Sequence, residues 1–155
     1  MVSSSQDVVE AALRAAGVRA ELRTFDQPVP TAAAAALALG CEVGAIANSL
    51  VFELDGTPLL VLASGAHRVD TKKLARGLCV GKIRRATPDF VLEHTGQHVG
   101  GVAPVGHPRP VRTVVDTALV NYRVVWAGAG DERSMFPTDF PRLLALTGGT
   151  AAAVA

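Results

Sequence analysis

Two apolar segments joined by a turn around Asp55 and Gly56 constrain the fold of this chain more than any other feature. Residues 49–54 and 59–63 are rich in Val, Leu and other apolar residues, and each has the length of a β-strand. An Asp-Gly pair favours a tight turn with positive φ at both central residues. We therefore expect an antiparallel β-hairpin, which rules out an all-parallel sheet.

Five segments have the features of helices. Apolar residues recur at helical spacing near the N-terminus, and Thr31, Asp70 and Thr87 are residue types whose side-chain oxygens cap a first turn. Pro88 follows Thr87 at the position where a helix favours proline. Glycines end most of these segments. The expected helices cover residues 6–16, 32–39, 70 to 75 or 76, 87–96, and 138 or 139 to 148.

Four further segments are expected to be strands, namely residues 19–25, 82–86, 111–115 and 122–127. Residues 100–110 are rich in Gly and Pro and are expected to form a loop, and residues 150–155 are expected to be a frayed tail. Helices and strands interleave throughout residues 1–149, without a linker or a repeat. This order predicts a single α/β domain whose mixed sheet curls toward a barrel, with helices packed against it.

The composition excludes several classes of protein. Hydrophobic residues make up 49% of the 155 residues and charged residues 19%, which is typical of a globular domain and not of a disordered one. The N-terminus lacks the basic and apolar regions of a signal peptide, and the longest apolar run, residues 32–39, is too short to cross a bilayer. Cys41 and Cys79 are isolated, which fits a reducing compartment. We expect a cytoplasmic protein without a membrane partner.

The segment 100–108 (GGVAPVGHP) holds three glycines and two prolines in nine residues. A loop of this kind has two interpretations. Glycine without a Cβ atom allows a ligand to approach the main-chain N–H groups closely. Alternatively, the segment is only a rigid connector between a helix and a strand.

Residues 72–85 carry six basic side chains and no acidic one, on a chain whose formal net charge is only +1. Such an excess can meet the phosphates of a nucleic acid. The other interpretation is a solvated helix face followed by a strand edge that charge protects from aggregation. The sequence leaves both open.

The sequence contains no conventional catalytic centre. The motifs of serine hydrolases, nucleotide-binding loops and zinc proteases are absent. His94 and His98 have the spacing of metal ligands on a helix, but Gly96 between them falls at the expected helix end, so we expect no metal site. His67 and His107 fall in loops, where they can donate hydrogen bonds to a substrate.

Six segments, taken in order, resemble the YbaK/EbsC family, also called the prolyl-tRNA synthetase-associated editing domain. The similarity runs from about residue 18 to residue 149. It implies an α/β domain with a strongly curved, barrel-like mixed sheet flanked by helices. The segments are residues 18–26 (VRAELRTFD), 47–52 (ANSLVF), 64–70 (SGAHRVD), 100–106 (GGVAPVG), 111–116 (VRTVVD) and 139–149 (DFPRLLALTGG).

The resemblance implies a trans-editing hydrolase that deacylates mischarged aminoacyl-tRNA without a cofactor or a metal. Its partners would be the 3′ acceptor end of aminoacyl-tRNA and an aminoacyl-tRNA synthetase, and not DNA. Backbone N–H groups of the glycine loop would stabilise charge on the carbonyl oxygen. The implied catalytic residues are Asn48, Gly100 and Gly101. The implied substrate-binding residues are Thr31, Ser49, Ser64, Gly65, Val102, Pro104, Gly106, His107 and Asp116, and the implied tRNA-binding residues are Arg68, Lys72, Lys73 and Arg76.

One position departs from the family pattern. Asn48 stands where characterised editing members have a substrate-contacting lysine. Exchanging a charged hydrogen bond for a neutral one costs about 1 kcal/mol, or roughly a five- to tenfold loss of rate. Three hypotheses follow: a deacylase that works without the lysine, an inactive module that binds tRNA or a synthetase, and a hydrolase of another small acylated metabolite. Arg68 or Lys72 is a candidate to replace the missing charge.

Overall fold

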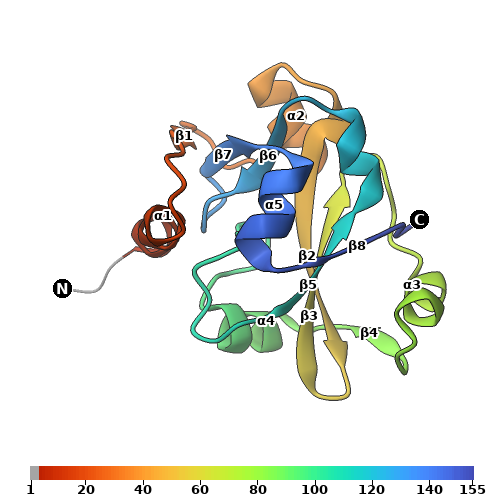
Figure 1. The fold of residues 1–155 in the computed structure, drawn as a ribbon. Helices are drawn as coiled ribbons and strands as arrows, with labels where there is room; N and C mark the ends of the chain where they lie inside the picture. The colour runs from red at the N-terminus through yellow and green to blue at the C-terminus, as the bar shows by residue number, and fades with distance from the viewer. Residues whose placement is uncertain (1–3) are drawn as a thin grey trace.

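The computed structural model describes residues 4–155 and shows an α/β domain built on a mixed, strongly curved sheet (Figure 1). The strand order is β1-β7-β6-β2-β3-β5-β8, and β4 pairs with β2 outside this path. The strands are β1 (Arg23–Thr24), β2 (Ile46–Leu54), β3 (Thr57–Ser64), β4 (Ile83–Arg85), β5 (Arg112–Asp116), β6 (Val125–Gly128), β7 (Ser134–Thr138) and β8 (Thr150–Ala152). The helices are α1 (Ser5–Ala15), α2 (Ala32–Leu39), α3 (Thr71–Leu78), α4 (Pro88–Thr95) and α5 (Phe140–Thr147), with short 3₁₀ segments η1 (Val43–Ala45) and η2 (Thr117–Asn121).

The predicted hairpin is confirmed and forms the centre of the sheet. β2 and β3 pair antiparallel from Ala47 opposite Ser64 to Leu54 opposite Thr57. Asp55 and Gly56 have φ angles of 51° and 80°, as the Asp-Gly turn requires. β2 pairs in parallel with β6, and β3 pairs in parallel with β5, so the sheet is mixed as expected.

The helix predictions are confirmed, with one boundary to correct. Thr31, Asp70, Thr87 and Asp139 cap α2, α3, α4 and α5 through their side-chain oxygens. We expected Gly77 to end α3, but the helix continues to Leu78. Cys79 supplies the left-handed residue instead, at a φ of 55°. The helix continues past Gly77 because its last turn is closed by the Cys79 N–H, which donates to Ala75 and Arg76.

Two strand predictions and the frayed tail are wrong. The segment 19–25 forms a strand only at Arg23–Thr24, and that strand pairs with β7, which we did not predict. The segment 122–127 becomes a strand only from Val125, because η2 extends to Asn121 and a bend at residues 123–124 separates it from the strand. Residues 150–152 form β8 beside β5, and Val154 is fully buried.

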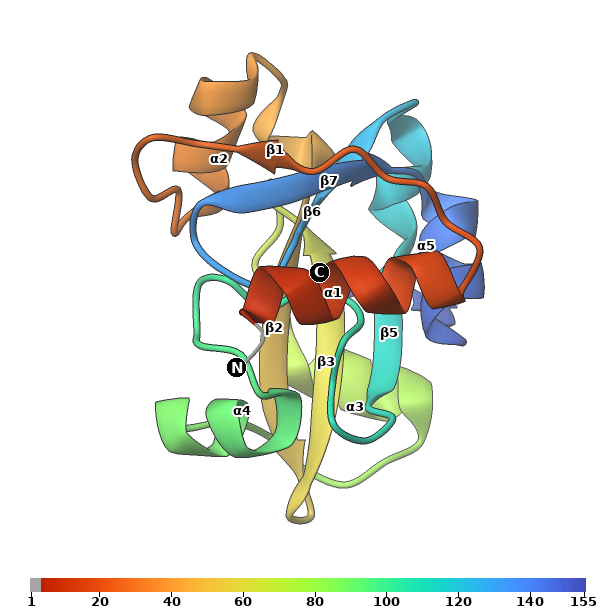
Figure 2. The same ribbon diagram turned by 90° about the vertical axis from the view of Figure 1, so that its left-hand side faces the viewer.

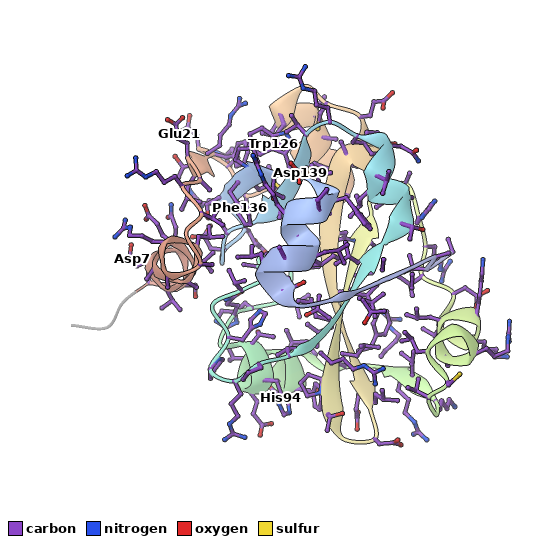
Figure 3. The ribbon with its side chains drawn as sticks, viewed as in Figure 1. Asp7, Glu21, His94, Trp126, Phe136 and Asp139 are labelled. Atoms are coloured by element: carbon purple, nitrogen blue, oxygen red, sulfur yellow. The ribbon has the colours of Figure 1, made fainter. Side chains whose placement is uncertain are left out.

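The core is aliphatic, as the composition indicated. Its largest cluster lies between the sheet and the helices α1 and α5, and it includes Leu13, Leu60, Leu143 and the fully buried Phe136 (Figure 3). α1 runs across one face of the molecule near β7 (Figure 2). Because Val9 and Leu13 of α1 belong to the same cluster as Val102 and Ala103, this helix holds the glycine loop against the domain.

Candidate functional site

The site begins at an opening in the sheet beside β2. On one side β2 is paired with β3 along its length, but on the other it pairs with β6 only at Ile46 and Ala47, and with β4 only from Phe52. Residues 48–51 therefore have no strand on that side in the described chain. The gap arises because β6 and β4 pair with different parts of β2 and leave the residues between them unpaired. We call residues 48–51 on this side the open edge.

The hydrogen-bond alternation decides which residues face the open edge. The Gly65 N–H donates to the Ile46 carbonyl across the hairpin at 2.8 Å. In an antiparallel pair the backbone groups of alternate residues point to the same side. The backbone N–H and C=O groups of Ser49 and Val51 therefore point into the open edge, and these groups need hydrogen-bond partners when they are buried.

The glycine loop forms the opposite wall. A cavity of about 250 Å³ lies between the open edge and Val99, Gly100 and Val102. We call it the first cavity. Its remaining walls are mostly apolar and come from the segment before α2, from α2 itself and from Met135 of β7. None of the residues that line it is acidic, basic or histidine; its polar side chains are Thr31, Asn48 and Ser49.

A second cavity of about 460 Å³ adjoins the first. Both cavities are lined by Ser49, Leu50, Val99 and Val102. The second cavity differs in charge, because Arg68 and Arg85 line it and no acidic residue does. Its other walls come from the start of α3, from β4 and from α4.

Ser49 stands where the two cavities meet, and its hydroxyl has no protein partner. Among the described residues, one buried side-chain oxygen or nitrogen atom makes no hydrogen bond, and that atom is Ser49 Oγ. A buried polar atom left unpaired costs about 1–3 kcal/mol. An orphaned hydroxyl between two cavities is therefore an indication of a ligand that completes its hydrogen bonding.

The loop glycines are required by packing, whatever they bind. Gly100 has a φ of +94°, and a Cβ there would come within 2.7 Å of Glu132 Oε1. A Cβ on Gly101 would lie 2.5 Å from the Cα of Asp131, which is backbone and cannot move aside. The loop is therefore a tightly packed connector that also lines the first cavity, and both interpretations of it stay open.

Gln97 braces this loop, a role that no motif in the sequence indicated. The side chain is 1% exposed. Its Oε1 accepts from the Ala103 N–H at 2.6 Å, and its Nε2 donates to the Val105 carbonyl at 3.1 Å. Thr95 Oγ1 in turn accepts from the Gln97 N–H and donates to Val91. A polar side chain that bonds two points in the middle of a glycine-rich loop fixes the path of the loop there.

Several expected substrate-binding residues lie away from both cavities. Asp116 is 1% exposed and accepts from the Ser64 N–H, and it also pairs with His67 Nδ1 at 2.8 Å. The Ser64 hydroxyl donates to the Gly44 carbonyl. Gly65 sits against the Val43 carbonyl, where a Cβ would not fit. These contacts join β3, β5 and the turn before β2, so their role is to hold these elements together.

His107 also lies apart from the cavities, together with Pro104 and Gly106. Its Nε2 lies 2.8 Å from the Ala103 carbonyl. Burial lowers the pKa of His107 from its ordinary value of 6.5, and the Ala103 carbonyl opposes this shift only in part. All three residues line a cavity of about 280 Å³ near the start of β5, and Gly106 and His107 also line one of about 430 Å³ beside α1. Their contacts hold the far end of the glycine loop.

The basic run separates into two groups. Arg85 and the preceding Arg68 face the second cavity. Lys72, Lys73 and Arg76 lie on α3 and line neither cavity, and Lys73 Nζ bonds the Ala155 carbonyl at 2.6 Å. Of the four residues expected to bind tRNA, only Arg68 therefore lines either cavity.

Residues 4–155 contain neither a cluster of three metal-ligating side chains nor a helix long and apolar enough to cross a membrane. His94 lies on α4 (Figure 3), where its ring stacks near Phe90 with a centroid distance of 4.3 Å.

Comparison with known proteins identifies the family. The sequence model of the aminoacyl-tRNA editing domain matches residues 26–146. The crystal structure of a candidate trans-editing enzyme for prolyl tRNA synthetase has a TM-score of 0.91 and 39% identity, covering 99% of this chain and 98% of that one. The uncharacterized protein YwhH of Bacillus subtilis is 31% identical over 115 residues, which are 74% of this chain and 73% of that protein.

A longer relative carries the same domain. The proline–tRNA ligase of Lysinibacillus sphaericus is 36% identical over 87 residues, which are 56% of this chain but 15% of the ligase. The similarity thus concerns one segment of that enzyme and not its whole length. Together with the full-length structural match, it confirms the family resemblance of the sequence motifs, and this chain belongs to the aminoacyl-tRNA editing domain family.

Proposed function

We propose that this chain hydrolyses the ester between an amino acid and the 3′-terminal ribose of tRNA, acting in trans. The observation that carries the proposal is the unpartnered Ser49 hydroxyl between the open edge and the glycine loop. The family membership and the trans-editing structural neighbour support it.

The first cavity has the properties of an acyl pocket. Its volume of about 250 Å³ and its walls of Val, Ala, Ile and Met suit a small or medium aliphatic side chain. A pocket of this kind discriminates mainly by excluding what is too large, because one methylene is worth only about 1–3 kcal/mol. We expect esters of bulky aromatic amino acids to be spared.

The chemistry needs no charged side chain in this cavity. Water adds to the ester carbonyl carbon, the bond from that carbon to the ribose oxygen breaks, and the proton lost by water ends on that oxygen. The negative charge that develops on the carbonyl oxygen can be stabilised by fixed hydrogen-bond donors. The available donors are the Ser49 hydroxyl, the Asn48 amide and the backbone N–H groups of the open edge and of Gly100.

The test is a deacylation assay on a panel of mischarged tRNAs. We expect the wild-type chain to cleave a small subset, and Ser49→Ala and Asn48→Ala to lower kcat by roughly tenfold or more. Asn121→Ala is the matched control, because Asn121 is exposed and lines neither cavity. Failure of the wild-type chain on the whole panel would refute the proposal. If only Asn48→Lys turns over, the natural chain is a binding module; if small esters are cleaved without tRNA, it is a hydrolase of small acylated metabolites.

A further inference from the structure

We propose that the second cavity binds the terminal nucleoside of the substrate together with its 5′ phosphate, and that Arg68 and Arg85 contact that phosphate. The inference rests on the proposed function, since it assumes an ester whose acyl group occupies the first cavity. It assigns a specific role to Arg85, one of the six cations of the basic run 72–85, among which the sequence did not discriminate.

The two cavities adjoin at the open edge. They share the residues at the open edge and on the glycine loop, and Ser49 lies at the junction. An aminoacyl nucleotide has an uncharged acyl half and a nucleotide half, joined at the ester. With the ester at Ser49 and the acyl group in the neutral first cavity, the ribose and its base extend into the second.

The second cavity combines positive charge with apolar surface. Arg68 follows β3 and Arg85 ends β4, so two arginines from separate elements line one cavity. Within residues 4–155 neither of them forms an ion pair. Guanidinium is well suited to phosphate because it offers paired N–H donors. Val69, Val91 and Val99 give the cavity apolar walls against which a base can pack.

The two neighbouring arginines of β4 differ in whether they line the second cavity. Arg84 precedes Arg85 in β4, but alternate side chains of a strand point to opposite faces. Arg84 lies opposite Glu53 and does not line the second cavity, whereas Arg85 lies opposite Phe52 and does. The chain therefore supplies a control of the same residue type, exposure class and strand.

The kinetic test compares three esters of the amino acid that the panel identifies: its tRNA, its ester with adenosine 5′-monophosphate, and its ester with adenosine. We expect Arg68→Gln and Arg85→Gln each to raise KM about three- to tenfold for the two phosphate-containing esters, with kcat little changed. Neither variant should alter the adenosine ester. Arg84→Gln should leave all three esters unchanged. The proposal would be overturned if KM rose equally for the adenosine ester. It would also be overturned if Arg84→Gln raised KM as much as the other two variants.

A binding measurement separates this inference from the proposed function. Adenosine 5′-monophosphate and adenosine are titrated into wild-type and variant proteins, and the backbone amide shifts of residues 49–51 are followed by NMR. We expect the monophosphate to bind more tightly, and the advantage to disappear in Arg68→Gln and Arg85→Gln. If this holds but no tRNA is deacylated, the nucleotide site stands and the proposed function fails. If tRNA is deacylated but neither arginine variant changes nucleotide binding, the nucleotide site is refuted and the proposed function is not.

The kinetic comparison, taken together with the titration, also distinguishes a general mononucleotide site from one that serves the tRNA end. If the site serves the tRNA end, the arginine variants must raise KM for the aminoacyl-tRNA as much as they raise it for the monophosphate ester. An effect confined to the free monophosphate would refute the assignment to tRNA.

Discussion

Replacing Gln97 with methionine removes two hydrogen bonds that hold the glycine loop while nearly preserving the side-chain volume. The variant leaves the Ala103 N–H and the Val105 carbonyl without their partner. Ala103 is fully buried, so water cannot readily replace the lost acceptor. An unsatisfied buried group costs about 1–3 kcal/mol, so the two together predict a loss of about 2–6 kcal/mol in the free energy of unfolding. That is a large share of the roughly 5–15 kcal/mol available to a domain.

The assay is urea denaturation followed by circular dichroism, with Gln27→Met as the matched control because Gln27 is exposed. We expect the midpoint to fall with an unchanged m-value for Gln97→Met and to stay in place for Gln27→Met. Hydrogen exchange at the Ala103 amide should accelerate in the Gln97 variant. A loss below about 0.5 kcal/mol, with the Ala103 amide still protected, would show that the side chain does not brace the loop.

Three further predictions concern other parts of the same framework. Gly101→Ala should cost about 2 kcal/mol or more by calorimetry because its Cβ would meet the backbone of the opposing turn, whereas Gly77→Ala, with open space around its Cβ, should be neutral or stabilise by up to about 1 kcal/mol. Burial lowers the pKa of His107 from 6.5, so its neutral form is favoured in the folded state; stability should be complete above that value and fall as the pH drops through it, and His107→Gln should lose this pH dependence in chemical denaturation. Val154→Ala should lower the free energy of unfolding by about 1–3 kcal/mol, and the exposed Val120→Ala by less than about 0.5 kcal/mol; equal effects would contradict the burial of the C-terminal segment.

Local signals were sufficient for much of the secondary structure. The Asp55-Gly56 turn and the capping residues Thr31 and Thr87 act over a few residues, so the hairpin and the helices could be predicted from short windows. The two-residue strand β1 and the strand β8 gave no such signal. Both are held by pairing with residues distant in the chain, β7 in one case and β5 in the other.

The candidate site shows the same division. The sequence motifs predicted Asn48, Ser49 and Gly100 as site residues, and the fold gathers them around one cavity. The sequence could not show which of Arg84 and Arg85 lines the second cavity, because only the pairing with β2 determines which face each side chain takes. Nor could it reveal Gln97, a common polar residue whose importance comes from being buried beside the loop.

The sequence by itself determined the hairpin, the capped helices and the glycine loop, since each depends on residues that are neighbours in the chain. Only the tertiary structure decided where β6 and β4 leave β2, and hence that residues 48–51 form an open edge opposite the loop. The open edge is a property of three strands together, fixed by long-range packing. No window of the sequence contains the interactions that create it.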